Sequence, residues 1–520
     1  MTVETNLLEV EWDPNAAAFQ GDAFQLDAFQ ARADDGWIDE TAYRLSTETA
    51  RGRDYASQLT GRASAGQLLA QLINVSGRFA SLYTSGALYP NIVPGRRVRL
   101  RTTLPSAATL WRGFLDDILP TPGGREWMPT VTLRASGPLR KVGARKAQTA
   151  MYTSLLTGTA VGYILDDADW PTADRTIDAG QITLNRWKAD GDFATNHLKE
   201  IEETEFGYVG ESADGKIVFE DVHHRLISPH TVSQATFSDA SGAALSYEAI
   251  EQLDPWREIF NRIEALVELF TVQSLAVLWT LTGETPAISP GAAITIWAAY
   301  PNPDSATAAH SVDAWTTPVA TTDYTANSAP GGGGSDLTGS VTVAVEKLAN
   351  AMKMTFTNAS ASTAYLTLVQ ARGTAVYRND PMRLVEEDAT SQTAYGPRTY
   401  PLPGTLYPST TVARSYAQHA LARYKDPLPV LRLTYQANQS AAHMTEALTR
   451  DVSDRITVVA SGTGASGAQL GINADFFVEA IRHRIDLAGH WVTYDLSLAV
   501  NQDSWVLGVS TLGVDTRLVV

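Results

Sequence analysis

The chain has 520 residues, of which 44% are hydrophobic and 9% are aromatic. This composition excludes a disordered or fibrous chain, and at roughly 100–200 residues per domain the length predicts about three or four domains. The formal net charge of −17 argues against a general binder of nucleic acid or of anionic membranes. The chain has no cysteine, which excludes disulfides, thiolate nucleophiles and cysteine-based metal sites.

No run of residues reaches the roughly 18 apolar positions that a membrane-spanning helix needs. The opening residues carry Glu4, Glu9 and Glu11 and no basic stretch, so we expect no signal peptide. A chain without an export signal is expected to be made and assembled in a cytoplasm.

The sequence predicts a mainly β, multidomain protein with α+β modules. Residues 1–145 are expected to form an N-terminal arm and a β-barrel domain. Polar and apolar residues alternate at 97–101 and again at 130–134, and clusters of Gly and Pro separate such runs. Short alternating runs between turn residues are typical of an all-β barrel or sandwich.

The N-terminal arm contains three phenylalanines at a spacing of five residues, Phe19, Phe24 and Phe29. This period matches neither the 3.6 of a helix nor the 2 of a strand, so we expect an extended segment. The three rings pack either on their own domain or on a neighbouring subunit, and the sequence leaves both interpretations open.

Charge is distributed unevenly over the first domain. Residues 1–50 hold 2 basic and 11 acidic side chains, whereas residues 96–146 hold 11 basic and 3 acidic side chains. Cations at this density repel one another unless acidic groups face them. We therefore expect the basic stretch, with Arg97, Arg99 and Arg101, to bind acidic surface from residues 1–50 of a neighbouring subunit or from an adjacent protein.

Residues 146–260 are predicted to form a small α+β module and a connector. Helices are expected over residues 149–165 and 192–204. A hairpin is expected over residues 205–220, because Asp214 and a glycine separate two runs of β-branched and aromatic residues.

Residues 261–377 are predicted to be an inserted β-sandwich-like domain, since short strands alternate with Ala, Thr, Ser and Gly. Four consecutive glycines at 331–334 predict a mobile, dispensable loop tip. Trp297, Tyr300 and Trp315 are either the core of this sandwich or an exposed binding surface.

Residues 378–520 are predicted to be a mixed α/β domain. A helix is expected over 410–424, before an Asp-Pro pair that stops it. Strands are expected over 430–435, 455–459, 476–485 and 491–500.

Motifs that carry chemistry are weak in this sequence. Residues 462–467 read G-x-G-x-x-G after a strand, but a strand follows instead of the helix that dinucleotide binding needs, so we interpret them as a turn. His223 and His224 lack the spacing of a zinc site. The acidic loop at 166–169 lacks the glycine and distal glutamate of a calcium-binding EF-hand.

Neighbouring carboxylates occur at Asp116–117, Glu202–203 and 386–388, but nothing in the sequence pairs them for acid–base chemistry. We therefore predict no catalytic, cofactor-binding or metal-binding residue, no cofactor and no enzymatic activity.

Eight short motifs follow one another over most of the chain: LINVSGRF at 72–79, LYPNIVPGRRVR at 88–99, LWRGFLDD at 110–117, WPTADR at 170–175, GKIVFED at 215–221, DYT at 323–325, ARYKDP at 422–427 and DRITV at 454–458. In this order they resemble the minor tail proteins of long-tailed, siphovirus-like bacteriophages, in the baseplate hub and tail-tip family. The order of the motifs carries the resemblance more than any one of them.

The resemblance implies a structural virion protein that closes the tail tube as a homotrimeric ring and helps DNA delivery or host attachment. Residues 1–145 and 378–520 are then hub-like domains around the channel. The implied partners are the distal tail ring, the tape measure and receptor-binding fibres, with no sequence-specific nucleic acid. The implied location is the tail tip or baseplate of the virion, assembled in the host bacterial cytoplasm, without a long C-terminal extension.

Two alternatives stay open. The first is a receptor- or carbohydrate-binding tail adhesin that uses the inserted β-sandwich to bind a host cell-surface glycan. The second is a tail-associated hydrolase.

Overall fold

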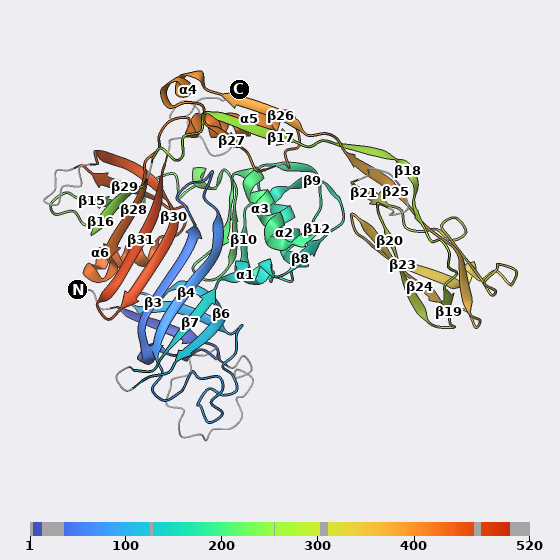
Figure 1. Ribbon diagram of the computed structural model, residues 1–520, viewed down its shortest axis with the longest axis horizontal. Coiled ribbons are helices and arrows are strands. Elements are labelled where there is room, and N and C mark those ends of the chain that lie inside the picture. The colour runs from blue at the N-terminus through green and yellow to red at the C-terminus, as the bar shows by residue number, and fades with distance from the viewer. Residues whose placement is uncertain are drawn as a thin grey trace.

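The computed structural model describes residues 4–12, 36–124, 128–253, 255–301, 310–404, 406–461 and 470–499 (Figure 1). The phenylalanines at 19, 24 and 29 and the glycine motif at 462–467 lie outside these ranges. The predicted mainly β fold with α+β modules and an inserted sandwich is confirmed. In the described part of the chain, no helix is long and apolar enough to span a membrane.

One 13-stranded sheet contains strands from both ends of the chain. Its N-terminal strands are β1 (Thr5–Val10), β2 (Ile38–Asp39), β3 (Arg44–Arg53), β4 (Ala63–Ile73), β5 (Arg97–Leu104), β6 (Ala108–Thr121) and β7 (Thr130–Ser136). Its remaining strands are β15 (Thr236–Ser238), β16 (Ala249–Leu253), β28 (Val430–Gln436), β29 (Arg455–Ala460), β30 (Ile472–Asp486) and β31 (Gly489–Leu498). The order is β16-β28-β31-β30-β3-β4-β7-β6-β5-β1-β2, with β29 also paired to β30 and β15 to β29.

The two ends of the chain meet where β3 pairs antiparallel with β30, with Thr49 opposite His483. On the N-terminal side, alternation places Leu68, Ala70 and Leu72 of β4 in a buried core. On the C-terminal side, a second core forms under α6 (Ala441–Thr449). The β-rich ends therefore share a continuous sheet but have separate cores.

The small module contains α1 (Pro138–Gly143), β8 (Lys146–Gln148), β9 (Tyr152–Leu156), α2 (Thr157–Asp167), β10 (Arg175–Ile177), β11 (Thr183–Trp187), β12 (Asp190–Phe193), α3 (Ala194–Glu205), β13 (Tyr208–Glu211) and β14 (Ile217–Glu220). The α3 helix and the β13–β14 hairpin are confirmed, with Leu198 and Ile201 buried. The helix predicted over 149–165 is wrong in its first half. Residues 152–156 pair with β11 instead, a partner that the local pattern does not reveal.

A three-stranded sheet above the module contains β17 (Arg262–Val267), β26 (Met382–Glu387) and β27 (Thr399–Pro401), with α4 (Ala389–Tyr395) and α5 (Thr410–Tyr424) beside it. The predicted helix over 410–424 is confirmed. Ser409 caps it by accepting a hydrogen bond from the Val412 amide. The alanines at 413, 417 and 420 form its buried face.

The insertion comprises residues 270–378 and projects away from the rest of the molecule (Figure 1). One of its sheets has β18 (Phe270–Thr280), β19 (Ala287–Ile288), β21 (Ser311–Trp315), β22 (Tyr324–Asn327) and β25 (Ala364–Arg378). The other has β20 (Ala293–Ala299), β23 (Val341–Lys347) and β24 (Ala351–Asn358). The core between them is apolar, and β18 and β25 connect the insertion to β17 and β26.

Short 3-10 turns complete the described secondary structure, at Thr41–Tyr43, Thr172–Asp174, His224–Leu226, Thr338–Ser340 and Ala437–Gln439.

Candidate functional site

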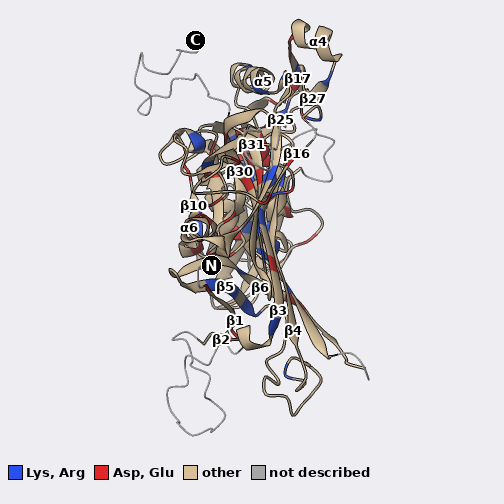
Figure 2. Cartoon of the chain, turned by 90° about the vertical axis from the view of Figure 1, so that its left-hand side faces the viewer, with Lys and Arg blue, Asp and Glu red and all other residues tan. Residues whose placement is uncertain are grey.

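The acidic residues of the first strand bind the basic residues of β5 within one chain. Glu9 accepts hydrogen bonds from Arg99 at 2.6 Å and from Arg101 at 2.6 and 2.7 Å. Glu11 forms an ion pair with Arg97. In Figure 2 the Lys and Arg segments of β5 lie next to β1. The expectation that these three arginines bind a neighbouring subunit or an adjacent protein is wrong, because their acidic partners are in their own chain.

Burial by itself raises the pKa of Glu9, but the hydrogen bonds from Arg101 and Arg99 outweigh it, and the net pKa is lowered. Glu9 is therefore ionised at neutral pH although its side chain is buried. This pairing fixes β1 onto β5.

A buried charge cluster lies at the junction of the large sheet and the small module. Arg225 donates two hydrogen bonds to Glu479 of β30, at 2.7 and 2.8 Å. Arg53 of β3 donates to Glu479 at 3.1 Å and to Glu202 of α3 at 3.3 Å. Ser497 of β31 donates to Glu479 at 2.6 Å. The cluster thus connects β3, β30, β31 and α3.

Burial by itself raises the pKa of Glu479, but Arg225 and Arg53 outweigh this effect, and the net pKa is lowered to about 2. The carboxylate is therefore ionised throughout the neutral range.

Three other glutamates near this junction have the opposite shift. Burial raises the pKa of Glu202, Glu205 and Glu211 to about 7 in each case. Glu205 accepts hydrogen bonds from the Gln181 amide at 2.6 Å and from the Thr157 hydroxyl at 2.9 Å. These three carboxyl groups titrate near pH 7. Each of them lies between secondary-structure elements, where it has a structural role.

Of the two histidines singled out in the sequence, His224 lies in a half-buried cluster with Asp178 and His230. His224 Nδ1 is 2.8 Å from Asp178 Oδ2, and the His224 and His230 ring centroids are 4.8 Å apart. Burial lowers the pKa of His224, but Asp178 outweighs it and the net pKa is raised. Over the described ranges, no group of three or more His, Asp or Glu side chains is placed to hold a metal ion.

Most of the carboxylates singled out in the sequence have structural partners. Asp166 pairs with Arg175 at 2.8 Å, and Asp169 pairs with Arg145. Asp388 caps α4 by accepting from the Ser391 amide at 2.9 Å. Other pairs are Asp116 with Arg140, Glu386 with Arg414 and Glu387 with Arg262.

The three aromatic residues of the insertion divide into two groups. Tyr300 and Trp315 are buried in the core of the sandwich, as one of the two interpretations predicted. Trp297 on β20 is 51% exposed, with Lys353 over its ring. Trp297 is thus the one of the three that is available for binding.

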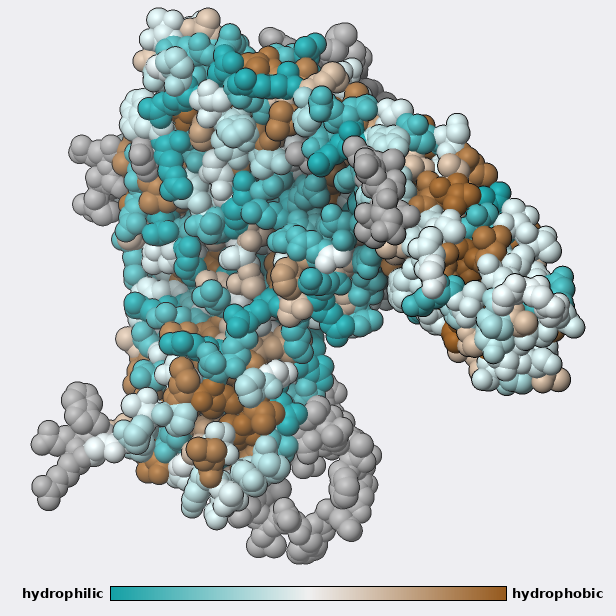
Figure 3. Space-filling view, turned by 45° about the vertical axis from the view of Figure 1, so that its right-hand side comes forward, coloured by the Kyte–Doolittle hydropathy of each residue, from teal (hydrophilic) through white to brown (hydrophobic). Residues whose placement is uncertain are grey.

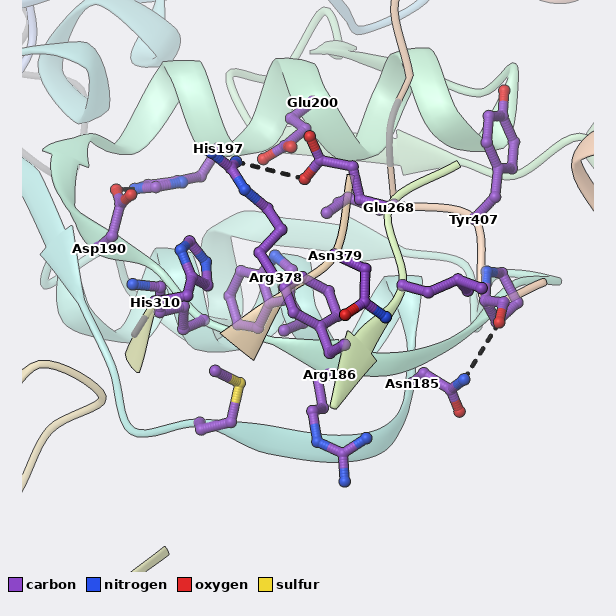
Figure 4. Close-up of a pocket in the computed structure, with 17 residues that line it drawn as sticks. Asn185, Arg186, Asp190, His197, Glu200, Glu268, His310, Arg378, Asn379 and Tyr407 are labelled. Carbon is purple, nitrogen blue, oxygen red and sulfur yellow. Dashed lines mark hydrogen bonds and ion pairs between the residues drawn. The ribbon is translucent and has the colours of Figure 1, made fainter. Parts of the chain in front are cut away.

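A pocket of about 380 Å³ lies between the small module and the base of the insertion (Figure 4). Asp190, His197 and His310 lie at one end, and Asn185 and Tyr407 lie at the other. The pocket could not be predicted from the sequence, because its residues come from distant segments and form no local motif.

Direct bonds beside the pocket connect the insertion to the module. Arg186 pairs with Asp313 of β21 at 2.8 Å, and Lys188 donates to Asn350 at 2.8 Å. The Ala349 amide donates to the Thr149 carbonyl at 3.0 Å. Inside the pocket, Arg378 reaches Glu268 at 3.4 Å.

Comparison with known proteins gives matches at the level of solved structures. No protein-family model matches the sequence, and no curated protein matches it. A 43 kDa tail protein of prophage MuSo2 from Shewanella oneidensis is 9% identical, with 95% of this chain and 98% of that chain covered and a TM-score of 0.48.

Two further solved structures are tail proteins. A tail protein from Neisseria meningitidis MC58 is 11% identical, with 95% and 97% of the two chains covered and a TM-score of 0.48. A prophage tail protein from Listeria monocytogenes EGD-e is 8% identical, with 94% of each chain covered and a TM-score of 0.39. All three likenesses are remote, and all three structures are described as tail proteins.

Proposed function

We propose that this chain is a structural protein of a bacteriophage tail, at the baseplate hub or tail tip that closes the tail tube. The single observation that carries the proposal is the pairing of β3 with β30, which makes one continuous sheet from the two β-rich ends. An extended, laterally joined sheet of this kind is suited to form part of a wall around a tube. The order of the sequence motifs supports the same role.

The proposed assembly is a homotrimeric ring. Each chain supplies two β-rich blocks, one at each end of the shared sheet, so three copies present six blocks to a six-fold tube. Such interfaces are heterologous and close on themselves. The distal tail ring, the tape measure and receptor-binding fibres are the proposed neighbours in the virion, with assembly in the host bacterial cytoplasm.

Averaged images of the tail tip, or of a subassembly co-expressed with the neighbouring tail proteins, test this proposal. We expect this chain to appear with three-fold symmetry around the tube axis. Six copies, or one asymmetric copy below the tube, would contradict the hub assignment.

The proposed hub also helps DNA delivery or host attachment. A second candidate function is a tail adhesin that binds a host receptor or glycan with the inserted β-sandwich. The observation that favours it is the insertion, which projects from the molecule and exposes apolar side chains (Figure 3). These are Val272, Leu275 and Val277 of β18 and Trp297 of β20.

We also propose that the chain has no enzymatic activity. The buried Glu9 and Glu479 have structural partners, and His224 and His230 are not among the residues that line the pocket. Purified protein should cause no loss of turbidity in a suspension of host cell walls, and a reproducible loss would favour the hydrolase alternative.

A further inference from the structure

The pocket between the small module and the base of the insertion has the size of a ligand site. Its volume of about 380 Å³ lies within the range of roughly 300–1,000 Å³ that is usual for small-molecule sites. Asn185 and Asp190 of the module contribute to its rim, and Arg378 and Asn379 face them from the end of the insertion (Figure 4). Both Asp190 and Asn379 are exposed there.

The charges that line the pocket balance one another. Three are basic and three are acidic: Arg186, Lys188, Arg378, Asp190, Glu200 and Glu268. Burial, with Lys188 and Arg378 nearby, lowers the pKa of His310 to about 4, and burial also lowers the pKa of His197. Both imidazoles are neutral at neutral pH, so the pocket favours neither an anion nor a cation.

The pocket is nevertheless rich in hydrogen-bonding groups. A neutral imidazole offers one donor and one acceptor, and each asparagine amide offers both. Asn185, Asn379 and His310 all line the pocket and supply such groups.

Apolar wall lies directly beside these groups. Met151, Leu269 and Phe270 line the same pocket, and the Phe270 ring stacks with His310 at 5.6 Å between centroids. Hydrogen-bonding groups beside an apolar wall suit a ring that has hydroxyl groups at its edge and C–H bonds on its face.

We propose that this pocket binds a neutral saccharide unit, with Asp190 and Asn379 hydrogen-bonded to its hydroxyl groups and Phe270 against its ring. The inference goes beyond the structural role in the tail and does not rest on it. It also moves the saccharide site of the adhesin candidate from the exposed face of the insertion to the pocket at its base.

The test uses the full chain and a defined panel of sugars. Saturation-transfer NMR and calorimetric titration are run with glucose, galactose, rhamnose, N-acetylglucosamine and their disaccharides, with trialanine as a neutral peptide. We expect at least one sugar to bind and trialanine not to bind. Asp190→Ala should weaken that binding by about tenfold or more, the loss expected for a hydrogen bond to a charged group, and Asn379→Ala should weaken it by about fivefold, the loss expected for a neutral hydrogen bond.

Two control variants make the result specific. Asp214→Ala changes an exposed carboxylate in the β13–β14 turn, and Trp297→Ala removes the exposed aromatic residue of the insertion. Both should leave the affinity unchanged. The inference is overturned if no sugar binds, if trialanine binds instead, if the two pocket variants bind like wild type, or if Trp297→Ala alone abolishes binding. None of these outcomes bears on the symmetry of the tail tip.

Discussion

Arg225 donates two hydrogen bonds to Glu479 across 254 residues of sequence, at the point where the small module meets the large sheet. Both side chains are buried, and Arg53 approaches the same carboxylate from β3. Removing one member of a buried ion pair leaves an uncompensated charge, which costs about 3–5 kcal/mol. The contact between Arg225 and Glu479 therefore contributes strongly to the attachment of the small module to the large sheet.

We expect Glu479→Gln to lower the free energy of unfolding by about 3–5 kcal/mol, because two guanidinium groups lose their shared carboxylate. Glu387→Gln is a matched control, since Glu387 pairs with Arg262 at 2.7 Å but is half exposed, and it should cost under about 1 kcal/mol. Urea unfolding of both variants measures the difference. Equal costs would mean that the buried cluster adds no more than a surface pair.

Stability should also depend on pH through the glutamates whose pKa is raised. The folded pKa of Glu205 is about 7, above its ordinary 4.5, so its contribution is fully present below about pH 4.5 and is lost as the pH rises through 7. The full loss amounts to about 3 kcal/mol, at 1.36 kcal/mol for each pKa unit. Glu205→Gln, which resembles the protonated form, should remove this part of the pH dependence.

Unfolding curves between pH 4.5 and 8 test the Glu205 prediction, with Glu387→Gln as the control that keeps the wild-type dependence. Glu479 acts in the opposite sense and at lower pH. Because its folded pKa is about 2, its contribution is present above about pH 4.5 and is lost as the pH falls through 2. A Glu205→Gln profile that parallels wild type from pH 5 to 8 would contradict the assignment.

Local sequence patterns predicted those elements whose start and stop signals are local. The α5 helix has a serine cap, an alanine face and a following Asp-Pro pair, and all three are visible in the sequence. The register of β3 on β30 could not be predicted, because the two strands come from opposite ends of the chain. The strand at 152–156 could not be predicted either, because pairing with β11 decides its conformation and the local pattern does not reveal that partner.

The charge pattern of the first domain shows what amino-acid composition can and cannot predict about contacts. The excess of cations in residues 96–146 predicted acidic partners from residues 1–50, and Glu9 and Glu11 are such partners. Charge counting does not say whether a partner belongs to the same chain. The pocket could not be predicted from composition. Its Asn, Asp and Arg residues are common types, and only the fold brings them together.

The bonds between the small module and the insertion should control the mobility of the insertion. Asp313→Ala removes the partner of Arg186, and we expect faster hydrogen exchange in β21 and at the β17–β18 connection. The overall free energy of unfolding should change by under about 1 kcal/mol, because the pair is partly exposed. Glu346→Ala, which removes a pair with Lys353 inside the insertion, is the control and should leave exchange at the connection unchanged.

The glycines at 331–334 are not equivalent. Gly331 has open space where a Cβ would lie, so Gly331→Ala should be neutral or slightly stabilising, by up to about 1 kcal/mol. A Cβ on Gly334 would lie 2.2 Å from Ser328 Oγ, and the Gly334 amide donates to Asn327 at 2.8 Å. Gly334→Ala should therefore lower the melting temperature of the insertion, and calorimetry compares the two. If neither variant changes the melting temperature, the whole tip is dispensable.

The last prediction concerns the ion pairs between β1 and β5. Reversal of Arg99 and Arg101 to Glu places three carboxylates around a buried position, so β1 should detach from β5. Hydrogen exchange of residues 5–10 measures this detachment, and Glu9→Lys in the reversed background should restore protection. Because the pairs are within one chain, exchange should rise in the isolated protein as well as in an assembly. The exposed Arg134→Glu on β7 is the control. If residues 5–10 stay protected in the double reversal, packing of Leu8 and Val10 alone holds the strand.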